Sequence, residues 1–195
     1  MWQQMIRGFK MMLVLTVLTG LLYPLAVTGL CQAFFRRQAD GSMVRAHGRI
    51  VGSSLIGQNF KGAEYLQPRP SAAGNDGYDP AAASGGMANY GPTNQKLADR
   101  VKDSVAAFRK ANPDYAGPIP ADLVTTSASG LDPDISPASA GAQAARIAAA
   151  RAVPVERVRS LIAASTQGRD LGFLGEPRVN VLAANLALDR EFPKR

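Results

Sequence analysis

The chain has 195 residues, enough for one domain with an appendage, and its 46% hydrophobic and 19% charged residues exclude a disordered chain and a coiled coil. The net charge of +7 does not by itself indicate a nucleic-acid partner, because four of the cations precede residue 38. From residue 38 onward 18 Lys and Arg stand against 15 Asp and Glu, a net of +3 that is only weakly basic. The single cysteine, Cys31, cannot form a disulfide within the chain and leaves the redox compartment open.

Residues 11–35 read MMLVLTVLTGLLYPLAVTGLCQAFF and carry no charge. A helix of this length spans about 37 Å at about 1.5 Å per residue, enough to cross a hydrocarbon core of roughly 30 Å. A cleaved signal peptide is disfavoured, because its apolar core normally has about 7–15 residues. The sequence predicts a single-pass membrane helix here, with residues 1–10 as an N-terminal flank and residues 36–195 as one soluble domain.

Small residues and a proline interrupt this predicted helix. Pro24 is expected to weaken one backbone hydrogen bond and to bend the helix. Gly20 and Gly29, together with Tyr23, are candidates for packing against other membrane helices. More basic residues follow the helix than precede it, which favours a domain on the inner side, but this rule is weakest for long translocated domains. Charge therefore leaves the side of the membrane open.

Residues 40–91 are rich in turn-forming residues. Three short β-prone pairs occur there: Ile50-Val51, Leu55-Ile56 and Tyr65-Leu66. Residues 71–91 (SAAGNDGYDPAAASGGMANYG) are rich in glycine, and a stretch of this kind inside a compact domain is usually a binding loop or a linker. Its tyrosines, Tyr78 and Tyr90, favour an ordered loop that grips something.

The second half of the chain has helical patterns. Apolar residues recur at helical spacing from Leu97 to Phe108, and Pro113 ends the run. Further helices are expected after Pro137, after Pro154 and over residues 180–191. The predicted fold class is α+β: one N-terminal transmembrane helix followed by a single compact mixed α/β soluble domain with short strands and about four helices.

The stretch DLVTTSASGLDPDISPASA, residues 122–140, resembles a metal loop at first sight. A calcium loop that began at Asp132 would need glycine at its sixth position and glutamate at its twelfth, where this chain has Pro137 and Gln143. A helix start fits better, with Ser136 as N-cap and Pro137 in the first turn. Asp132 and Asp134 would then lie near the positive end of that helix. Ser127, Ser129 and Gly130 are candidates for an anion pocket.

Catalytic and nucleotide motifs are incomplete. The chain has one histidine, His47, and neither a GxSxG nor an SxxK motif accompanies its serines. Residues 52–59 (GSSLIGQN) have the glycine spacing of a phosphate loop, but Gln58 and Asn59 replace the required Lys-Ser/Thr. Residues 143–165 suggest a helix-turn-helix, yet arginines on a short helix more often form a solvated face, so no nucleic-acid partner is expected.

Six segments taken together resemble the C subunit family of the bacterial Kdp potassium-transporting ATPase. They are TGLLYPLAVTG (19–29), GSSLIGQNF (52–60), YLQPRPSAA (65–73), YDPAAASGGMANYGPTN (78–94), DLVTTSASGLDPDISPASA (122–140) and LGEPRVNVLAANLALD (174–189). The resemblance covers about residues 10–190, with small departures at Gln67 and at residues 88–90.

The resemblance implies a non-catalytic accessory subunit of a four-subunit pump in the bacterial inner membrane. Its partners would be a channel-like A subunit, a P-type B subunit that hydrolyses ATP, the F subunit and the lipid bilayer. The family is described as a catalytic chaperone that raises the ATP affinity of the B subunit. No cofactor is then expected on this chain alone, and ATP would be shared with the B subunit. Structural accounts of the family place the soluble domain on the periplasmic side, which makes direct contact with ATP hard to explain unless the coupling is conformational.

The family match also suggests partner- or ligand-contact residues, for which fixing loop geometry is the alternative role. They are Arg69, Pro70, Ser71, Tyr78, Gly91, Pro92, Thr93, Asn94, Ser127, Ser129, Asp132 and Ser136. A second reading of the chain is a self-standing membrane-anchored ligand-binding module whose pocket is the loop at residues 71–91.

Overall fold

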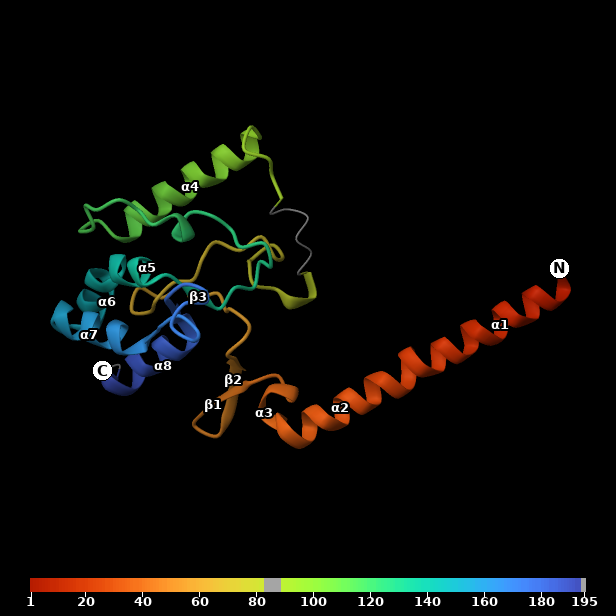
Figure 1. The fold of residues 1–195 in the computed structure, drawn as a ribbon. Helices are drawn as coiled ribbons and strands as arrows, with labels where there is room; N and C mark the ends of the chain where they lie inside the picture. The colour runs from red at the N-terminus through yellow and green to blue at the C-terminus, as the bar shows by residue number, and fades with distance from the viewer. Residues whose placement is uncertain (83–88, 194–195) are drawn as a thin grey trace. The chain divides into compact units, whose positions relative to one another are not determined.

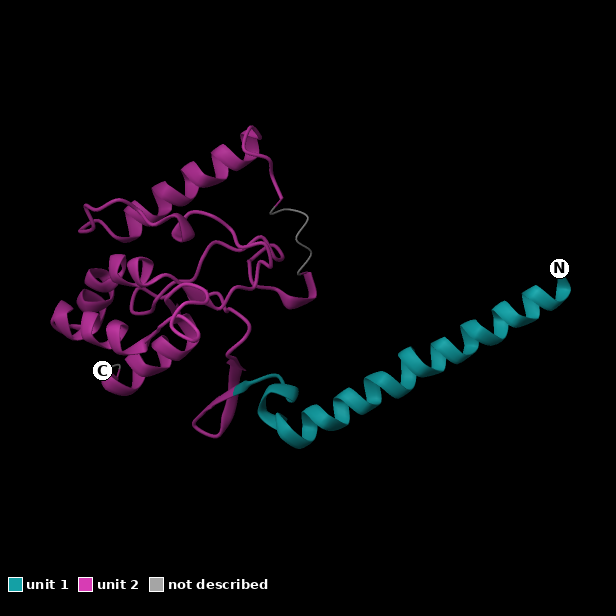
Figure 2. Ribbon diagram, in the orientation of Figure 1, with its two compact units in different colours: residues 1–43 teal, residues 44–195 magenta. Residues whose placement is uncertain are grey.

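The computed structural model describes residues 1–82 and 89–193, so residues 83–88 of the predicted glycine-rich loop lie outside the described part. The chain has an α+β fold with one N-terminal apolar helix followed by short strands and helices (Figure 1). It divides into two compact units, Met1–Met43 and Val44–Arg195 (Figure 2). Each unit is described by itself.

The first unit is a long helix and a short one. Helix α1 covers Trp2–Val17, a π-helical turn η1 covers Leu18–Leu22, α2 covers Tyr23–Phe34, and α3 covers Arg36–Ala39. The helix therefore begins at Trp2, nine residues before the predicted start. The π-helical turn ends two residues before Pro24. Because proline has no N–H to donate to the carbonyl one turn earlier, a backbone irregularity is expected at this place.

The stretch Trp2–Phe34 is long and apolar enough to cross a membrane by length and composition. None of its apolar window is buried within the chain. A soluble protein would not leave so much apolar surface in water, because each buried Å² contributes about 25 cal/mol. The helix needs lipid or other helices around it.

Among its described residues, the second unit has five short strands in two sheets. β1 (Met43–Ala46) pairs with β2 (Arg49–Ser53), and His47-Gly48, both at positive φ, form the tight turn between them. In the other sheet, β5 (Arg178–Asn180) is central and antiparallel to β3 (Asp134–Ile135) and β4 (Thr166–Gln167). Ile50-Val51 lies in β2 as expected, but the pairs Leu55-Ile56 and Tyr65-Leu66 lie outside any strand.

The described part of this unit has five α-helices. They are α4 (Gln95–Ala111), α5 (Pro137–Ala142), α6 (Ala144–Arg151), α7 (Val155–Ser165) and α8 (Val181–Glu191). Four of them begin where the sequence predicts a helix, whereas α6 results from a division of the single helix expected after Pro137. Asn94, Ser136 and Asn180 each cap a helix, with side-chain oxygens that accept a backbone N–H of the first turn. Short 3-10 turns lie at Pro80–Ala82 (η2) and Ala121–Leu123 (η4).

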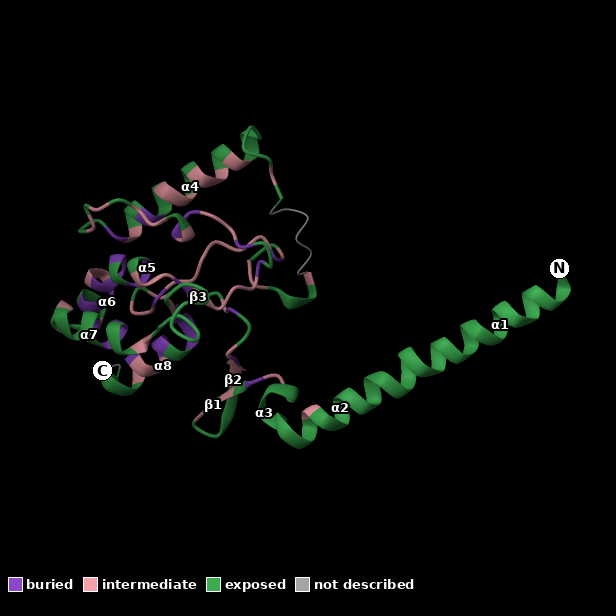
Figure 3. Ribbon diagram, in the orientation of Figure 1, coloured by how far each residue is buried: buried purple, intermediate pink, exposed green. Residues whose placement is uncertain are grey.

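The main core lies where α5 to α8 pack around the central strand β5 (Figure 3). Ile147, Val158, Val179 and Leu188 are each 0% exposed there, and Leu66 joins them from the irregular segment before α4. A smaller cluster of Phe108, Leu123 and Ala142 attaches the C-terminal end of α4. The second unit is therefore a helical core with one irregular side, and the predicted contact loops lie on that side.

The acidic residue that serves the start of α5 is Asp122. Its carboxylate accepts hydrogen bonds from Ser136 N at 2.8 Å and from Ser139 Oγ at 2.5 Å. Asp132 and Asp134, expected in that role, bond instead to Arg69 and to Asn180. The chain folds back from η4, and this brings an acid 14 residues upstream to the helix end, where negative charge is favoured.

Candidate functional site

The structure brings seven of the twelve predicted contact residues into two adjoining loops. We call residues 69–78 and 126–132 the loop junction. Of the twelve, it contains Arg69, Pro70, Ser71, Tyr78, Ser127, Ser129 and Asp132. Ser136 follows at the start of α5. The remaining four, Gly91 to Asn94, form the exposed turn before α4, where Asn94 is the helix cap.

Arg69 is the charged centre of the loop junction. Its Nη1 donates to Asp132 Oδ2 at 2.8 Å, and its Nη2 donates to the Thr126 carbonyl at 3.4 Å. The two side chains of the ion pair are 24% and 26% exposed, so water screens the pair only in part. Its Nε is buried and has no hydrogen-bond partner among the described residues. Arg69 therefore fixes one loop against the other.

The side chains of Ser71 and Tyr78 form hydrogen bonds with backbone groups of the same loops. Ser71 Oγ donates to the Gly130 carbonyl at 2.6 Å and accepts the N–H of Tyr78 at 2.9 Å. Tyr78 has a positive φ of 58°, and its hydroxyl donates to the Arg69 carbonyl at 2.8 Å. Burial, with a further contribution from Asp132, raises the pKa of Tyr78 far above its ordinary value against the opposing effect of Arg69. The phenol is thus a neutral donor that holds the loop.

In the predicted anion pocket, both serine hydroxyl oxygens accept backbone N–H groups of their own turn. Ser127 Oγ accepts the N–H of Gly130 at 3.0 Å, and Ser129 Oγ accepts the N–H of Leu131 at 3.2 Å. The two hydroxyls are 3.4 Å apart. Both serines therefore support their own turn, which is the structural role that serine commonly has in such loops.

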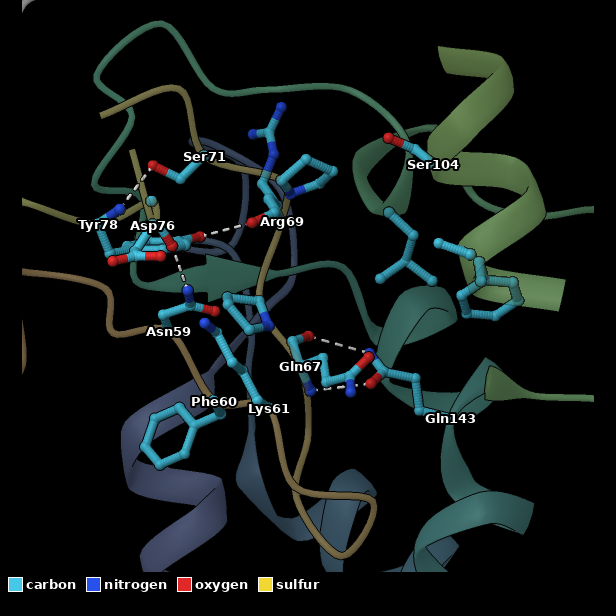
Figure 4. A pocket seen from close by; sticks show the side chains of 16 residues that line it. Asn59, Phe60, Lys61, Gln67, Arg69, Ser71, Asp76, Tyr78, Ser104 and Gln143 are labelled. Atoms are coloured by element: carbon cyan, nitrogen blue, oxygen red, sulfur yellow. Dashed lines mark hydrogen bonds between the residues drawn. The ribbon is translucent and has the colours of Figure 1, made fainter. Parts of the chain in front are cut away.

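A pocket of about 420 Å³ lies beside the junction, between α4 and the segment 59–78 (Figure 4). Ser71, Asp76, Gly77 and Tyr78 of the predicted glycine-rich loop line one side of it. Gln67 and the buried Gln143 face each other across two hydrogen bonds of 2.8 and 3.1 Å at another side. Lys61 adds a positive charge, and Phe108 and Leu123 add apolar surface. The pocket is lined by polar, charged and apolar side chains together. Such a lining suits the binding of a peptide segment or a polar ligand better than catalysis.

Residues 52–59 do not form a phosphate loop in the structure. They follow strand β2, but the next helical turn in the described part is η2 at Pro80–Ala82, so the glycines do not lead into the N-terminus of a helix. Gln58 Nε2 donates to the Val51 carbonyl at 2.7 Å and closes the turn. The segment therefore lacks both the lysine and the helix that bind phosphates.

The sequence did not predict the role of two buried arginines, Arg146 and Arg151. Arg146 donates to the carbonyls of Gly62, Ala63 and Tyr65 and to two side chains, and burial, opposed by Glu64, lowers its pKa to about 10. The Arg151 side chain is 2% exposed and donates hydrogen bonds to Asp189 and to three backbone carbonyls. Together they hold the irregular segment 62–65 on the helices. The sequence did hold a sign of this role: both arginines lie in an alanine-rich helix that otherwise packs into the core, where an arginine needs hydrogen-bond partners.

The arginines of the suspected helix-turn-helix have partners on the protein surface. Arg157 pairs with Glu191 at 3.4 Å and stacks on Phe192, and Arg159 pairs with Glu156 at 2.7 Å. In the part of the chain that the structure describes, no group of three or more His, Cys, Asp or Glu could hold a metal ion. His47 lies in the turn between β1 and β2.

The membrane-helix candidates lie around the π-helical turn. Gly20 is within it, Tyr23 and Pro24 begin α2, and Gly29 is farther along α2. A Cβ added at Gly29 would meet nothing within 4 Å, and one at Gly20 would meet only the Thr16 side chain at 3.9 Å. Both positions are therefore open to a neighbouring helix.

Comparison with known proteins gives one consistent family. The family model described as "KdpC: K+-transporting ATPase, c chain" matches residues 5–190. A protein of Myxococcus xanthus named potassium-transporting ATPase KdpC subunit is 56% identical over 98% of this chain and 90% of its own length. Proteins of the same name from Beijerinckia indica and Caulobacter vibrioides are 53% and 59% identical over 99% and 91% of this chain, and 96% and 88% of their own lengths.

Proposed function

The chain belongs to the KdpC family, and we propose that it serves as a membrane-anchored, non-catalytic accessory subunit of an ATP-driven potassium uptake pump. One observation carries this proposal: the family model matches residues 5–190 and the Myxococcus xanthus relative covers 98% of this chain, so the membrane helix and the soluble unit are both included. A domain that had only been recruited to another anchor would match over the soluble part alone.

The geometry of the chain supports an accessory role. Side chains of the loop junction form hydrogen bonds within each of its two loops and between them, so the junction supplies a fixed surface rather than reacting groups. The membrane helix is exposed along its length and has open glycine positions, which suits packing against partner helices. We expect those partners to be the A, B and F subunits of the pump.

The effect on ATP is part of the proposal. With the soluble domain on the periplasmic side of the inner membrane, a rise in the ATP affinity of the B subunit has to be transmitted through conformational change. The fold of residues 52–59 supports this view, because that segment lacks the helix and lysine of a phosphate loop. The chain would then stabilise one state of the pump, and ATP binding by the B subunit would favour the same state.

A second candidate function, a self-standing ligand-binding module, is favoured by the pocket beside the loop junction. The two functions differ in what the membrane helix does. In a pump subunit it packs against partners, whereas in a self-standing module it is only a tether.

Replacing residues 11–35 by a polyleucine anchor tests the difference. We expect loss of potassium uptake and loss of co-purification with the other pump subunits, while the soluble unit keeps its unfolding transition. A finer variant, Gly20→Leu with Gly29→Leu, should weaken co-purification, and the matched control Val17→Leu with Val27→Leu should not. Full uptake with the polyleucine anchor would contradict the pump-subunit role and support the tethered module.

A further inference from the structure

The first hairpin of the second unit presents basic and apolar side chains together. Arg45 on β1 and Arg49 on β2 are exposed, and so are Ile50 (54%), Leu55 (62%) and Ile56 (39%). We call these five residues the juxtamembrane strip. Figure 3 shows the turn of the hairpin exposed on the protein surface. Exposed large aliphatic side chains within a few positions of exposed arginines are typical of segments that bind something.

The two arginines of the strip form no ion pair in the part of the chain that the structure describes. Among residues 1–82 and 89–193, no carboxylate forms an ion pair with Arg45 or Arg49. The sequence around them is also one-sided, because residues 36–61 contain five cations and one acid, Asp40. Elsewhere in the second unit exposed arginines do have acidic neighbours, as Arg157, Arg159 and Arg169 do. The strip is therefore complementary to an anionic surface.

The hairpin of β1 and β2 would be stabilised by a further surface packed against it. β1 and β2 form a sheet of only two strands, separate from the sheet of β3, β5 and β4. An isolated two-stranded hairpin is marginally stable in water and usually needs a further layer. Ile50 on β2 is more than half exposed, so the described protein does not supply that layer over this side chain.

Chain continuity limits how far the hairpin can be from a bilayer. The apolar helix ends at Phe34 and β1 begins at Met43, so residues 35–42, eight in number, connect them. Eight residues extend at most about 28 Å, at roughly 3.4 Å each. The start of β1 is thus held within about 28 Å of the end of the apolar helix, whichever side of the membrane the soluble domain occupies.

We propose that the juxtamembrane strip binds the surface of the bilayer, with Arg45 and Arg49 on the phosphates of anionic lipids and Ile50, Leu55 and Ile56 in the interfacial layer. The inference rests on the proposed membrane-anchored role. Basic residues near a membrane gain from anionic lipids, and aliphatic neighbours add apolar burial. A protein partner is disfavoured as the first occupant, because the strip has unpaired charge of one sign next to the point where the chain leaves the membrane.

Fluorescence quenching by lipid tests the proposal on the full chain. The chain has one tryptophan, Trp2, so Trp2→Phe with Leu55→Trp gives a single reporter in the strip. The protein is reconstituted in vesicles of brominated phosphatidylcholine, with or without a third of brominated phosphatidylglycerol. We expect at least two-fold stronger quenching in the anionic vesicles, and we expect 0.5 M salt to remove most of the difference.

Variants that change the charge of Arg45 and Arg49 test whether these two residues bind the lipid. Arg45→Glu with Arg49→Glu should reduce the quenching difference by about five-fold or more, since each arginine near an anionic surface contributes on the order of 1 kcal/mol. The matched control is Lys96→Glu with Lys102→Glu, which makes the same charge change on exposed positions of α4 and should leave quenching unchanged. Arg45→Gln with Arg49→Gln, checked by circular dichroism, separates lost binding from misfolding.

Three results would overturn the proposal: equal quenching in both lipids, no effect of the strip variants, or shielding of the reporter only when the other pump subunits are present. The last result would identify the strip as a protein interface. The readout uses this chain alone in vesicles, so failure here is distinct from failure of the pump-subunit role, which potassium uptake and co-purification measure.

Discussion

Asp122 connects η4 to the start of α5 through one carboxylate. Oδ2 accepts the N–H of Ser136 at 2.8 Å, and Oδ1 accepts the hydroxyls of Ser139 at 2.5 Å and Ser136 at 3.2 Å. Burial raises the pKa of Asp122, but these hydrogen bonds outweigh burial, so its pKa lies below the ordinary value of 3.8. The ionised form therefore stabilises the folded protein.

Replacing Asp122 by Asn should destabilise the full chain by about 1–3 kcal/mol at pH 7, because charge-assisted hydrogen bonds are lost. A depressed folded-state pKa contributes stability that is complete above pH 3.8 and is lost as the pH falls through the lower folded value. The difference between Asp122→Asn and the native chain should accordingly shrink below about pH 4. Denaturant unfolding in detergent, followed by near-UV circular dichroism, measures it, and Asp114→Asn at an exposed position is the control.

The sequence predicted half of this arrangement. Ser136 is a helix cap because the type of residue, the following proline and the helical pattern all lie within a few positions. Asp122 was not predicted, because its role depends on a fold-back over 14 residues that no local pattern encodes. Arg69 was named as a contact candidate, but its ion pair with Asp132 spans 63 positions and could be found only in the folded chain.

The end of β2 and the segment that follows it, residues 53–60, dock on the loop that precedes β3. Gly57 N donates to the Leu131 carbonyl at 2.9 Å. A Cβ built on Gly57 would lie 2.5 Å from the Asp132 carbonyl and would also overlap the ring of Tyr78. The glycine is required here for a close approach of two backbones, and the backbone neighbour cannot rotate away as a flexible side chain could.

Gly57→Ala should therefore destabilise the second unit by about 1–3 kcal/mol, the usual range for overpacking a filled site. Gly91→Ala is the matched control, because a Cβ there would meet nothing within 4 Å. Thermal unfolding of both variants in the same detergent gives the comparison. Equal stability of the two variants would mean that residues 53–60 are not docked as the structure has them.

Element prediction succeeded where a pattern is long and failed where it is short. Apolar residues at helical spacing predicted α4 and α8, and prolines marked the starts of α5 and α7, whereas the division between α5 and α6 was not predicted. β3, β4 and β5 have two or three residues each, too few for an alternating pattern to be visible. Leu66 looked like part of a strand, yet it is a core residue whose backbone is bonded by the side chain of Asn185.

For the whole molecule, the distribution of basic residues raises a question about topology. The cations after the helix outnumber those before it, which would favour a domain on the inner side by the charge rule. If Arg45 and Arg49 bind lipid headgroups, these cations serve a local contact on whichever face the domain occupies. The charge excess then agrees with a periplasmic domain, and topology has to be measured directly.

Cysteine labelling measures topology. In a Cys31→Ala background, Asp114→Cys places one exposed thiol in the second unit, and Gln4→Cys places one at the N-terminal end of the apolar helix. We expect an impermeant thiol reagent to label position 114 in intact cells, and to label position 4 only after lysis, because the helix between them crosses the membrane once. This pattern would exclude direct contact between the soluble domain and cytoplasmic ATP, and it would require conformational coupling for any effect on ATP affinity. The reverse pattern would contradict the proposed side of the membrane and would make direct nucleotide contact the mechanism to test next.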